Sequence, residues 1–224
     1  MNHIVVKSIK TRYDHPQNHF IIDGKPITFY VDESVKHNNS SLMRFGSLLG
    51  LLPAWSGELE WQWENDFIWE LVDAPEELNV PVLVCEDDCD LSCIVILVHI
   101  RKEGDRVYWD RMGSLDHSNE SLQEKRENGI LCLEAYTDED WAKYGDNIAT
   151  ERYGSYEYRK WVDENLHEEY IRQLRNYTKP YMQREENIEW IQELQWEFDA
   201  KEYEAAVEQY RAIKRLQDEK RKYR

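Results

Sequence analysis

Three regularly spaced cysteines are residues that could bind a metal ion or a metal cluster. Cys85, Cys89 and Cys93 lie four positions apart, and Cys132 could complete a set of four thiolate ligands for zinc or an iron–sulfur cluster. The spacing matches neither the paired two-residue gaps of zinc ribbons nor the common cluster motifs. Acids between the cysteines also raise the pKa of a thiol and disfavour the thiolate. We therefore expect no metal and no cofactor, and interpret these cysteines as small apolar residues at strand ends.

The acids between the cysteines form a second candidate site. Carboxylates on a tight turn can bind a hard cation, or they can receive Lys and Arg side chains from a protein partner. The glycine and the glutamate that a calcium loop requires at its sixth and twelfth positions are missing. A solvated loop is the plainer interpretation of these acids, and between the two binding roles we favour protein contact over metal. The residues are Glu86, Asp87, Asp88 and Asp90.

These acids belong to a longer segment of one-sided charge. Between Arg44 and Arg101 the sequence holds 12 Asp or Glu residues and no Lys or Arg, so the segment contributes −12 to the net charge of −17. Such a segment repels itself and attracts a basic partner. Solubility is the plainer explanation of the total charge, but it does not explain the uneven distribution. Further acids expected in the partner-binding site are Glu58, Glu60 and Glu64.

Tryptophans accompany these acids. Four of the nine Trp lie in the same segment, and large aromatic side chains beside charges are typical of protein interfaces. We expect a tryptophan left exposed beside the acids to anchor a partner. Most tryptophans belong to cores, however, and those that we assign to the core are Trp61, Trp63, Trp109 and Trp161.

Other chemistries find little support. The seven His show no spacing typical of metal ligands, and we interpret His99, inside an apolar strand, as a satisfied core residue. No phosphate-binding glycine loop and no Gly-x-Ser-x-Gly signature occurs. The pI of about 4.8 disfavours direct nucleic-acid binding. We therefore expect a protein that is not an enzyme.

The first two thirds of the chain predict mainly strands. Asp23-Gly24 separates the apolar runs 20–22 and 27–31, which predicts a hairpin. A short helix over 42–52 should end at Pro53. The other predicted strands are residues 4–6, 80–85, 93–101, 106–110 and 130–135.

Residues 58–72 leave two predictions open. Residues 58–64 alternate polar and apolar side chains, which predicts a strand that turns at Asn65-Asp66 into a second strand. Leu59, Trp63, Phe67 and Leu71 are four apart, which predicts a helix instead. We favour the hairpin.

After Thr137 the pattern becomes helical. Thr137 precedes three acids, as at a helix N-terminus, and apolar residues at three- and four-residue spacing follow between Tyr158 and Leu174. Thr178 and Pro180 predict the start of another helix. Its expected stripe is Ile188, Ile191, Leu194 and Phe198, and residues 203–216 continue the pattern. Residues 211–224 hold seven basic residues against two acids, which suits a helix C-terminus.

The expected fold is α+β. Residues 1–150 should form a body with a mostly antiparallel sheet, and residues 151–224 a helical region packed on it rather than independent. No apolar stretch approaches the roughly 20 residues of a membrane helix, and the N-terminus lacks the plan of a secretory signal. With few cysteines as well, we expect a cytoplasmic protein that does not bind membranes.

The expected function is to bind and neutralise a basic protein. An immunity protein, or antitoxin, that blocks a nuclease-type toxin is the most concrete version, because nucleases present a positive surface to nucleic acid. One alternative is a metal-dependent or hydrolytic enzyme that uses the cysteines or the acids. Another is a structural or adaptor protein that docks through its C-terminal helices. Pairing of the basic C-terminus with the acids of a second copy would give a homo-oligomer.

Overall fold

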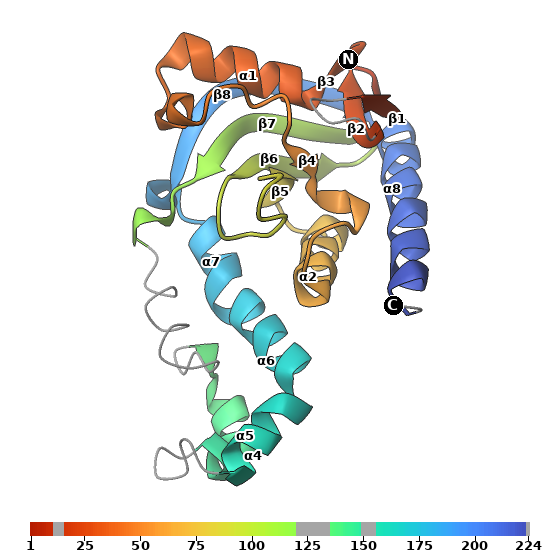
Figure 1. Cartoon of the computed structure of the whole chain (residues 1–224). Coiled ribbons are helices and arrows are strands. Elements are labelled where there is room, and N and C mark those ends of the chain that lie inside the picture. The colour runs from red at the N-terminus through yellow and green to blue at the C-terminus, as the bar shows by residue number, and fades with distance from the viewer. Residues whose placement is uncertain (11–15, 120–134, 149–155, 223–224) are drawn as a thin grey trace. The chain divides into compact units, whose positions relative to one another are not determined.

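The computed structural model describes residues 1–10, 16–119, 135–148 and 156–222, and it divides into two compact units. Unit 1 combines Met1–His117 with Glu185–Arg224, and unit 2 is Ser118–Arg184 (Figure 1). Unit 1 is α+β with antiparallel sheets, and the described elements of unit 2 are helical, so the α+β class is confirmed. These units do not follow a boundary at 150, because the chain returns to unit 1 after residue 184.

Two antiparallel sheets form the framework of unit 1. The smaller has the order β1-β2-β3, and the larger the order β4-β5-β6-β7-β8 (Figure 1). The large sheet is a meander from β5 to β7, to which the distant β8 adds an edge. Strand bounds are β1 (Ile4–Lys10), β2 (Pro16–Ile22), β3 (Lys25–Pro26), β4 (Leu52–Pro53), β5 (Leu78–Val84), β6 (Val95–Glu103), β7 (Arg106–Leu115) and β8 (Ile188–Asp199).

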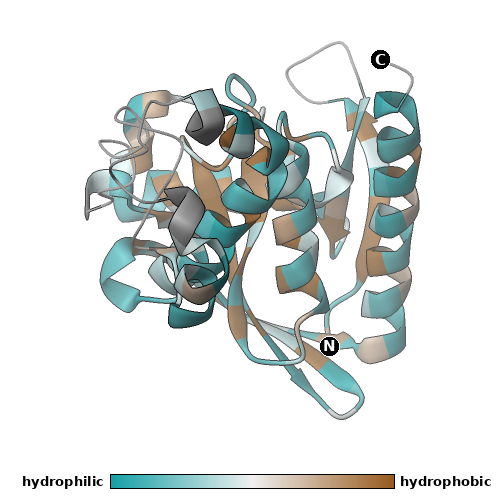
Figure 2. Cartoon of the chain, turned by 90° about the horizontal axis from the view of Figure 1, so that it is seen from below, coloured by the Kyte–Doolittle hydropathy of each residue, from teal (hydrophilic) through white to brown (hydrophobic). Residues whose placement is uncertain are grey.

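Within its described residues, unit 1 also contains the helices α1 (Ile27–Asn38), α2 (Gln62–Asp73) and α8 (Ala200–Arg221). Short 3-10 turns cover Ser41–Phe45, Ala54–Ser56, His117–Asn119 and Glu185–Asn187. In Figure 2 hydrophobic colour alternates with hydrophilic colour along α8. The buried residues of this helix, Tyr203, Ala206, Val207 and Tyr210, recur at the spacing of one helical face.

Two regions predicted to form strands contain helices instead. The Asp23-Gly24 turn is present, with φ of 47° and 84°, but the run after it continues as α1 instead of a long strand. Ile27 and Val31 are fully buried one helical turn apart, so tertiary packing outweighs their β-propensity. The hairpin favoured over 58–72 is also wrong, because α2 buries Phe67, Ile68 and Leu71 on one face.

The helix predicted over 188–198 is strand β8. Its buried residues are Ile188, Ile191 and Leu194, followed by Trp196 and Phe198. The β7–β8 register shifts twice, and Gln195 has a positive φ of 52°. Such bulges insert an extra residue, so the buried positions recur every third residue before they return to alternation. The irregular strand thereby imitates a helical stripe.

Some predictions of short elements are confirmed and others are wrong. The predicted helix over 42–52 is only the 3-10 turn at 41–45. Thr137 precedes the helix that begins at Asp138, as predicted. Its Oγ1 accepts a hydrogen bond from the Asp140 amide at 3.2 Å, and the Asp140 carboxylate accepts one from the Thr137 amide at 3.0 Å, so the two residues cap this helix reciprocally. Thr178 is not a cap, since it lies within a continuing helix. The strand predicted over 130–135 falls outside the described residues except for Ala135.

An aromatic cluster joins the elements of unit 1. The Phe20 ring of β2 packs edge-on against Trp55, Trp109 and Tyr210, with ring centroids 5.0, 5.3 and 4.7 Å away. All four side chains are at most 1% exposed. Because these residues come from the small sheet, a 3-10 turn, the large sheet and α8, edge-to-face packing and burial fix the position of α8 against the sheets.

Unit 2 contains α4 (Asp138–Ile148), α5 (Tyr156–Glu164), α6 (Leu166–Gln173) and α7 (Lys179–Met182), with a π-helical segment Leu174–Thr178 between the last two. Arg172, which is 5% exposed, donates to Asp140 at 2.9 Å and pairs with the buried Glu169. Tyr136 also donates to Glu169, so these buried polar groups satisfy one another. Among the described helices of both units, none combines the length and the apolar composition needed to cross a membrane.

We expect His19 to make the stability of unit 1 depend on pH. Its side chain is fully buried on β2, and burial lowers its pKa from 6.5 to about 4. Protons therefore bind the unfolded chain preferentially, so the free energy of unfolding is unaffected above pH 6.5 and falls as the pH drops from 6.5 towards 4, by about 3 kcal/mol in total.

Urea unfolding of the wild type and of His19→Leu at pH 7 and pH 5 measures this effect. The wild type should lose about 2 kcal/mol more than the variant between these two pH values. An equal loss in both proteins would show that His19 is not the group responsible.

Candidate functional site

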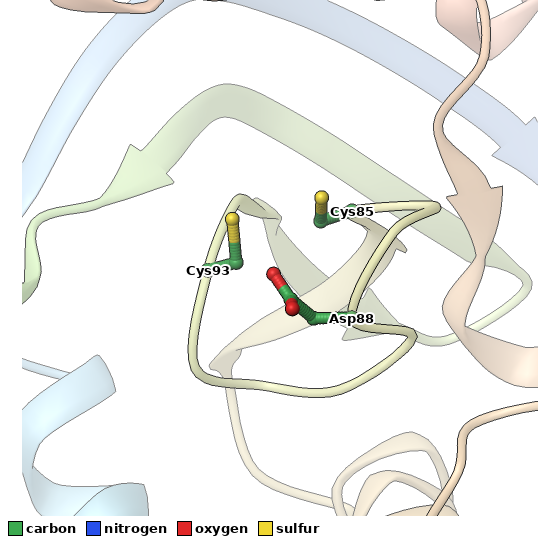
Figure 3. A group of neighbouring side chains, drawn as sticks. All are labelled: Cys85, Asp88 and Cys93. Atoms are coloured by element: carbon green, nitrogen blue, oxygen red, sulfur yellow. The ribbon is translucent and has the colours of Figure 1, made fainter.

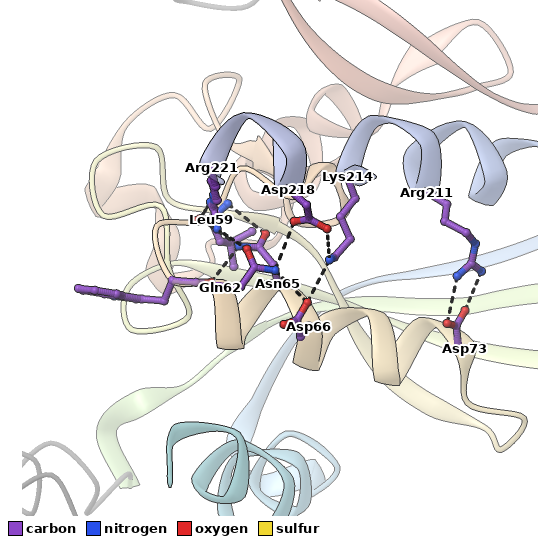
Figure 4. Close-up of polar contacts among 10 residues, drawn as sticks. Leu59, Gln62, Asn65, Asp66, Asp73, Arg211, Lys214, Asp218 and Arg221 are labelled. Atoms are coloured by element: carbon purple, nitrogen blue, oxygen red, sulfur yellow. Dashed lines mark hydrogen bonds and ion pairs between the residues drawn. The ribbon is translucent and has the colours of Figure 1, made fainter. Parts of the chain in front are cut away.

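Helix α8 lies beside α2 and pairs with two of its acids (Figure 4). Arg211 makes a bidentate pair with Asp73, at 2.8 and 3.1 Å, and the Lys214 ammonium lies 3.0 Å from Asp66. The basic C-terminus therefore neutralises part of the acidic segment within the same chain. Neither Asp66 nor Asp73 was among the predicted site residues.

The end of α8 also contacts the loop before α2. Arg221 donates to Gln62 Oε1 at 2.9 Å and to the Leu59 carbonyl (Figure 4). Gln217 donates to the Glu58 carboxylate at 2.7 Å. Burial raises the pKa of Glu58, although nearby Lys220 and Arg221 oppose that shift. Glu58 is therefore part of an internal contact rather than an open binding surface.

A glycine allows α8 to come this close. Gly57 has a φ of +75°, and a Cβ at this position would lie 3.0 Å from the Lys214 Cα. A side chain would thus meet the backbone of the helix. Both the positive φ and the close approach require glycine here.

Glu64 is also internal. It lies in the first turn of α2, is 4% exposed, and accepts a hydrogen bond from the Leu91 amide at 3.5 Å. Glu86 is half-buried, and its carboxylate lies against Gly50, leaving no space for a side chain there. Three of the seven predicted partner-binding acids, Glu58, Glu64 and Glu86, are therefore wholly or partly withdrawn from the surface.

The other four predicted acids come together at the surface. The Glu60 amide donates to the Cys89 carbonyl at 2.9 Å, which fixes Glu60 beside the loop that joins β5 to β6. Glu60, Asp88 and Asp90 all act electrostatically on the Cys89 thiol and raise its pKa, after the larger effect of burial. Asp87 and Asp88 are exposed, and Asp90 is half-buried.

Trp61 directly follows Glu60 in the chain and is 42% exposed. Its assignment to the core is therefore wrong, whereas that of Trp109, fully buried, is confirmed. Trp61 stacks on Trp63 with 5.0 Å between ring centroids, and the buried Asn65 donates to its carbonyl at 2.8 Å. The position of this ring is thus well defined. Together, Glu60, Trp61, Asp87, Asp88 and Asp90 are termed the acidic surface below.

The cysteines divide into a pair and an outlier. Cys85 and Cys93 approach Asp88 (Figure 3), and one ligand atom of each residue lies within 4.8 Å of the others. Cys89 has a φ of 53°, and its thiol donates instead to the Glu86 carbonyl at 3.1 Å. Cys132 lies outside the described residues.

The thiols of this loop are poor nucleophiles. Burial raises the pKa of Cys93 to about 12, with further contributions from hydrogen bonds to Cys85 and Asp88. A nucleophilic cysteine needs the opposite, a cationic setting that favours the thiolate. The Nδ1 atom of His99 is hydrogen-bonded to Asn79 at 2.8 Å and its Nε2 atom to Glu77 at 2.7 Å, so both ring nitrogens have partners, as expected of a structural histidine.

We predict that Lys214 stabilises the contact between α8 and α2. Its side chain is 14% exposed and lies between Asp66 and Asp218, 3.0 and 2.8 Å away, so its removal leaves two partly buried carboxylates close together. Lys214→Met should lower the free energy of unfolding by about 1–2 kcal/mol, measured by urea denaturation. Lys201→Met, at an exposed lysine of the same helix, is the control. Equal losses in the two variants would contradict the role of Lys214.

Comparisons with protein-family models, with curated proteins and with solved structures found no match to this chain. No function can therefore be transferred from a relative. The functional proposals below depend on the contacts, burial and charges of the described residues.

Proposed function

We propose that this chain is a non-enzymatic protein that binds a basic protein through its acidic surface. The observation on which the proposal depends is the exposure of Trp61 beside Glu60 and the acidic loop. A large aromatic ring in a defined position supplies contact area at little cost in conformational entropy. The surrounding carboxylates supply charge complementarity to Lys and Arg.

An immunity protein that neutralises a nuclease-type toxin is the most concrete form of this proposal. A nuclease needs a positive surface to hold nucleic acid, and an acidic inhibitor that covers this surface gains association rate and specificity from the attraction. Asp66 and Asp73 already have cationic partners in α8, so the acidic surface is the part of the charged segment that we assign to a partner. These ion pairs also favour contact of the basic C-terminal helix with the acidic segment of its own chain over contact with that of a second copy.

The proposed location is the cytoplasm. Cys85, Cys89 and Cys93 are free thiols in the structure, and a reducing compartment keeps them so. The raised pKa values of Cys89 and Cys93 speak against a thiol-dependent hydrolase.

Affinity capture of the tagged protein from its native host tests the proposal. The wild type should retain a basic protein in stoichiometric amount at low salt and release it at high salt. Glu60→Lys with Asp87→Lys should lose it, because both residues are exposed in the acidic surface. Glu193→Lys with Glu204→Lys, at exposed sites on β8 and α8, changes the net charge equally and should retain it.

Two outcomes of this capture would contradict the proposal. One is that E60K/D87K retains the basic protein as well as E193K/E204K does, which would make the acidic surface merely solubilising. The other is that the wild type is recovered alone or only with copies of itself.

We predict that Trp61 controls the lifetime of the complex. Trp61→Ala should raise the dissociation rate of the captured protein about 30-fold, because buried tryptophan anchors contribute about 2 kcal/mol or more. Trp141→Ala is the control, because Trp141 is similarly exposed, at 40%, but belongs to unit 2. Surface plasmon resonance measures both rates, and similar dissociation of the two variants would contradict the anchor role.

A further inference from the structure

The loop between β5 and β6 brings two thiols and a carboxylate together. Cys85 is buried directly after β5, Cys93 is half-buried before β6, and Asp88 comes from the turn between them (Figure 3). The Cys85 amide donates to the Ile94 carbonyl at 2.9 Å, which closes the base of the loop. One sulfur or oxygen atom from each of the three side chains lies within 4.8 Å of the other two.

This separation is close to that of a formed metal site. With Zn–S bonds of about 2.3 Å, two sulfurs of a tetrahedral zinc are about 3.8 Å apart. Small side-chain rotations therefore suffice to bring the three ligands to bonding distance, and Asp88 is exposed and can rotate. Two sulfurs favour a borderline-soft cation such as Zn²⁺ over Mg²⁺ or Ca²⁺, which prefer oxygen ligands.

The surroundings favour a cation and leave a coordination position open. The exposed acids Glu60 and Asp87 add negative charge near the loop. The three side chains also line a pocket of about 190 Å³, together with residues that include Leu48, Gly50 and Glu86. A water molecule in this pocket can serve as a fourth ligand, as in zinc sites with three protein ligands.

We propose that Cys85, Asp88 and Cys93 bind one Zn²⁺ ion, with solvent in the pocket as the fourth ligand. The spacing is Cys-x2-Asp-x4-Cys, so the equally spaced Cys89 is not a ligand. Each thiol gives its proton to solvent when its sulfur binds the metal, so two protons are released for each ion. The bound ion cross-links the end of β5 to the start of β6 beneath the loop that displays Asp87. This proposal does not depend on the proposed function, and with the ion bound Asp88 no longer contributes to the acidic surface.

Titration of the metal-free, reduced protein with Co²⁺ tests the site, because thiolate–cobalt bonds give charge-transfer absorption. We expect one equivalent of Co²⁺ to bind with this absorption, to be displaced by Zn²⁺, and to release two protons. The double variant Cys89→Ser with Cys132→Ser should behave in the same way, since it retains only Cys85 and Cys93. Absence of thiolate–cobalt absorption in the wild type would overturn the proposal, as would its loss in the double variant.

Removal of a ligand provides the complementary test. Cys93→Ser and Asp88→Asn change residues that are not fully buried, and circular dichroism and urea unfolding of the metal-free proteins verify that they fold. Each should weaken Co²⁺ binding at least about tenfold. Cys93→Ser should also reduce the charge-transfer absorption, whereas a merely structural Cys93 would leave both affinity and spectrum unchanged. Unchanged binding in these folded variants would overturn the proposed ligand set.

Discussion

The packing of α8 on both sheets and on the 3-10 turn Ala54–Ser56 is the interaction on which the rest of unit 1 depends. The segment from residue 45 to 100 has no Lys or Arg of its own, and Arg211 and Lys214 supply cations to two of its acids. Tyr210 of the same helix enters the aromatic cluster at 4.7 Å from Phe20. Apolar burial holds the helix in place, and the ion pairs make that position compatible with a strongly acidic neighbour.

This interaction also divides the acids by role. Asp66 and Asp73 pair with α8, and Glu58 accepts a hydrogen bond from it. Glu60 and the loop after β5 instead face solvent beside Trp61. A charge that is one-sided in the sequence thus becomes a localised surface in the fold, and a localised surface is what electrostatic recognition requires.

An element could be predicted from the sequence where nearby residues alone decide its conformation. Strands β5 and β6 were predicted because continuous apolar runs need no knowledge of their neighbours, and β7 was predicted because the turn at Gly104 precedes it. Strand β8 was predicted as a helix because its bulges, which depend on pairing with β7, change the period of its buried residues. Helix α1 was missed for a related reason, since packing decided the conformation of an apolar run with high β-propensity.

Some parts of the candidate site could be predicted from the sequence and others could not. The acidic loop could be found from charge alone, because it combines four acids within five residues. The burial of Glu58 and Glu64 could not, since it depends on α8 and on the chain near Leu91. The pairing of Cys85 and Cys93 with Asp88, to the exclusion of Cys89, depends on the turn of the loop rather than on equal spacing. The alternating pattern over residues 58–64 suggested that Trp61 belongs to the core. Its exposure instead follows from the position at which α2 begins, directly after Trp61.

In the proposed function, the acidic surface attracts a basic protein electrostatically. The most direct test of this attraction is the association rate constant of the captured partner, measured by stopped-flow fluorescence of the tryptophans over a series of salt concentrations. We expect this rate constant to fall at least about tenfold between about 50 mM and about 500 mM salt. A rate constant that stays the same across the series would contradict the attraction, because an association steered by charge cannot be insensitive to screening.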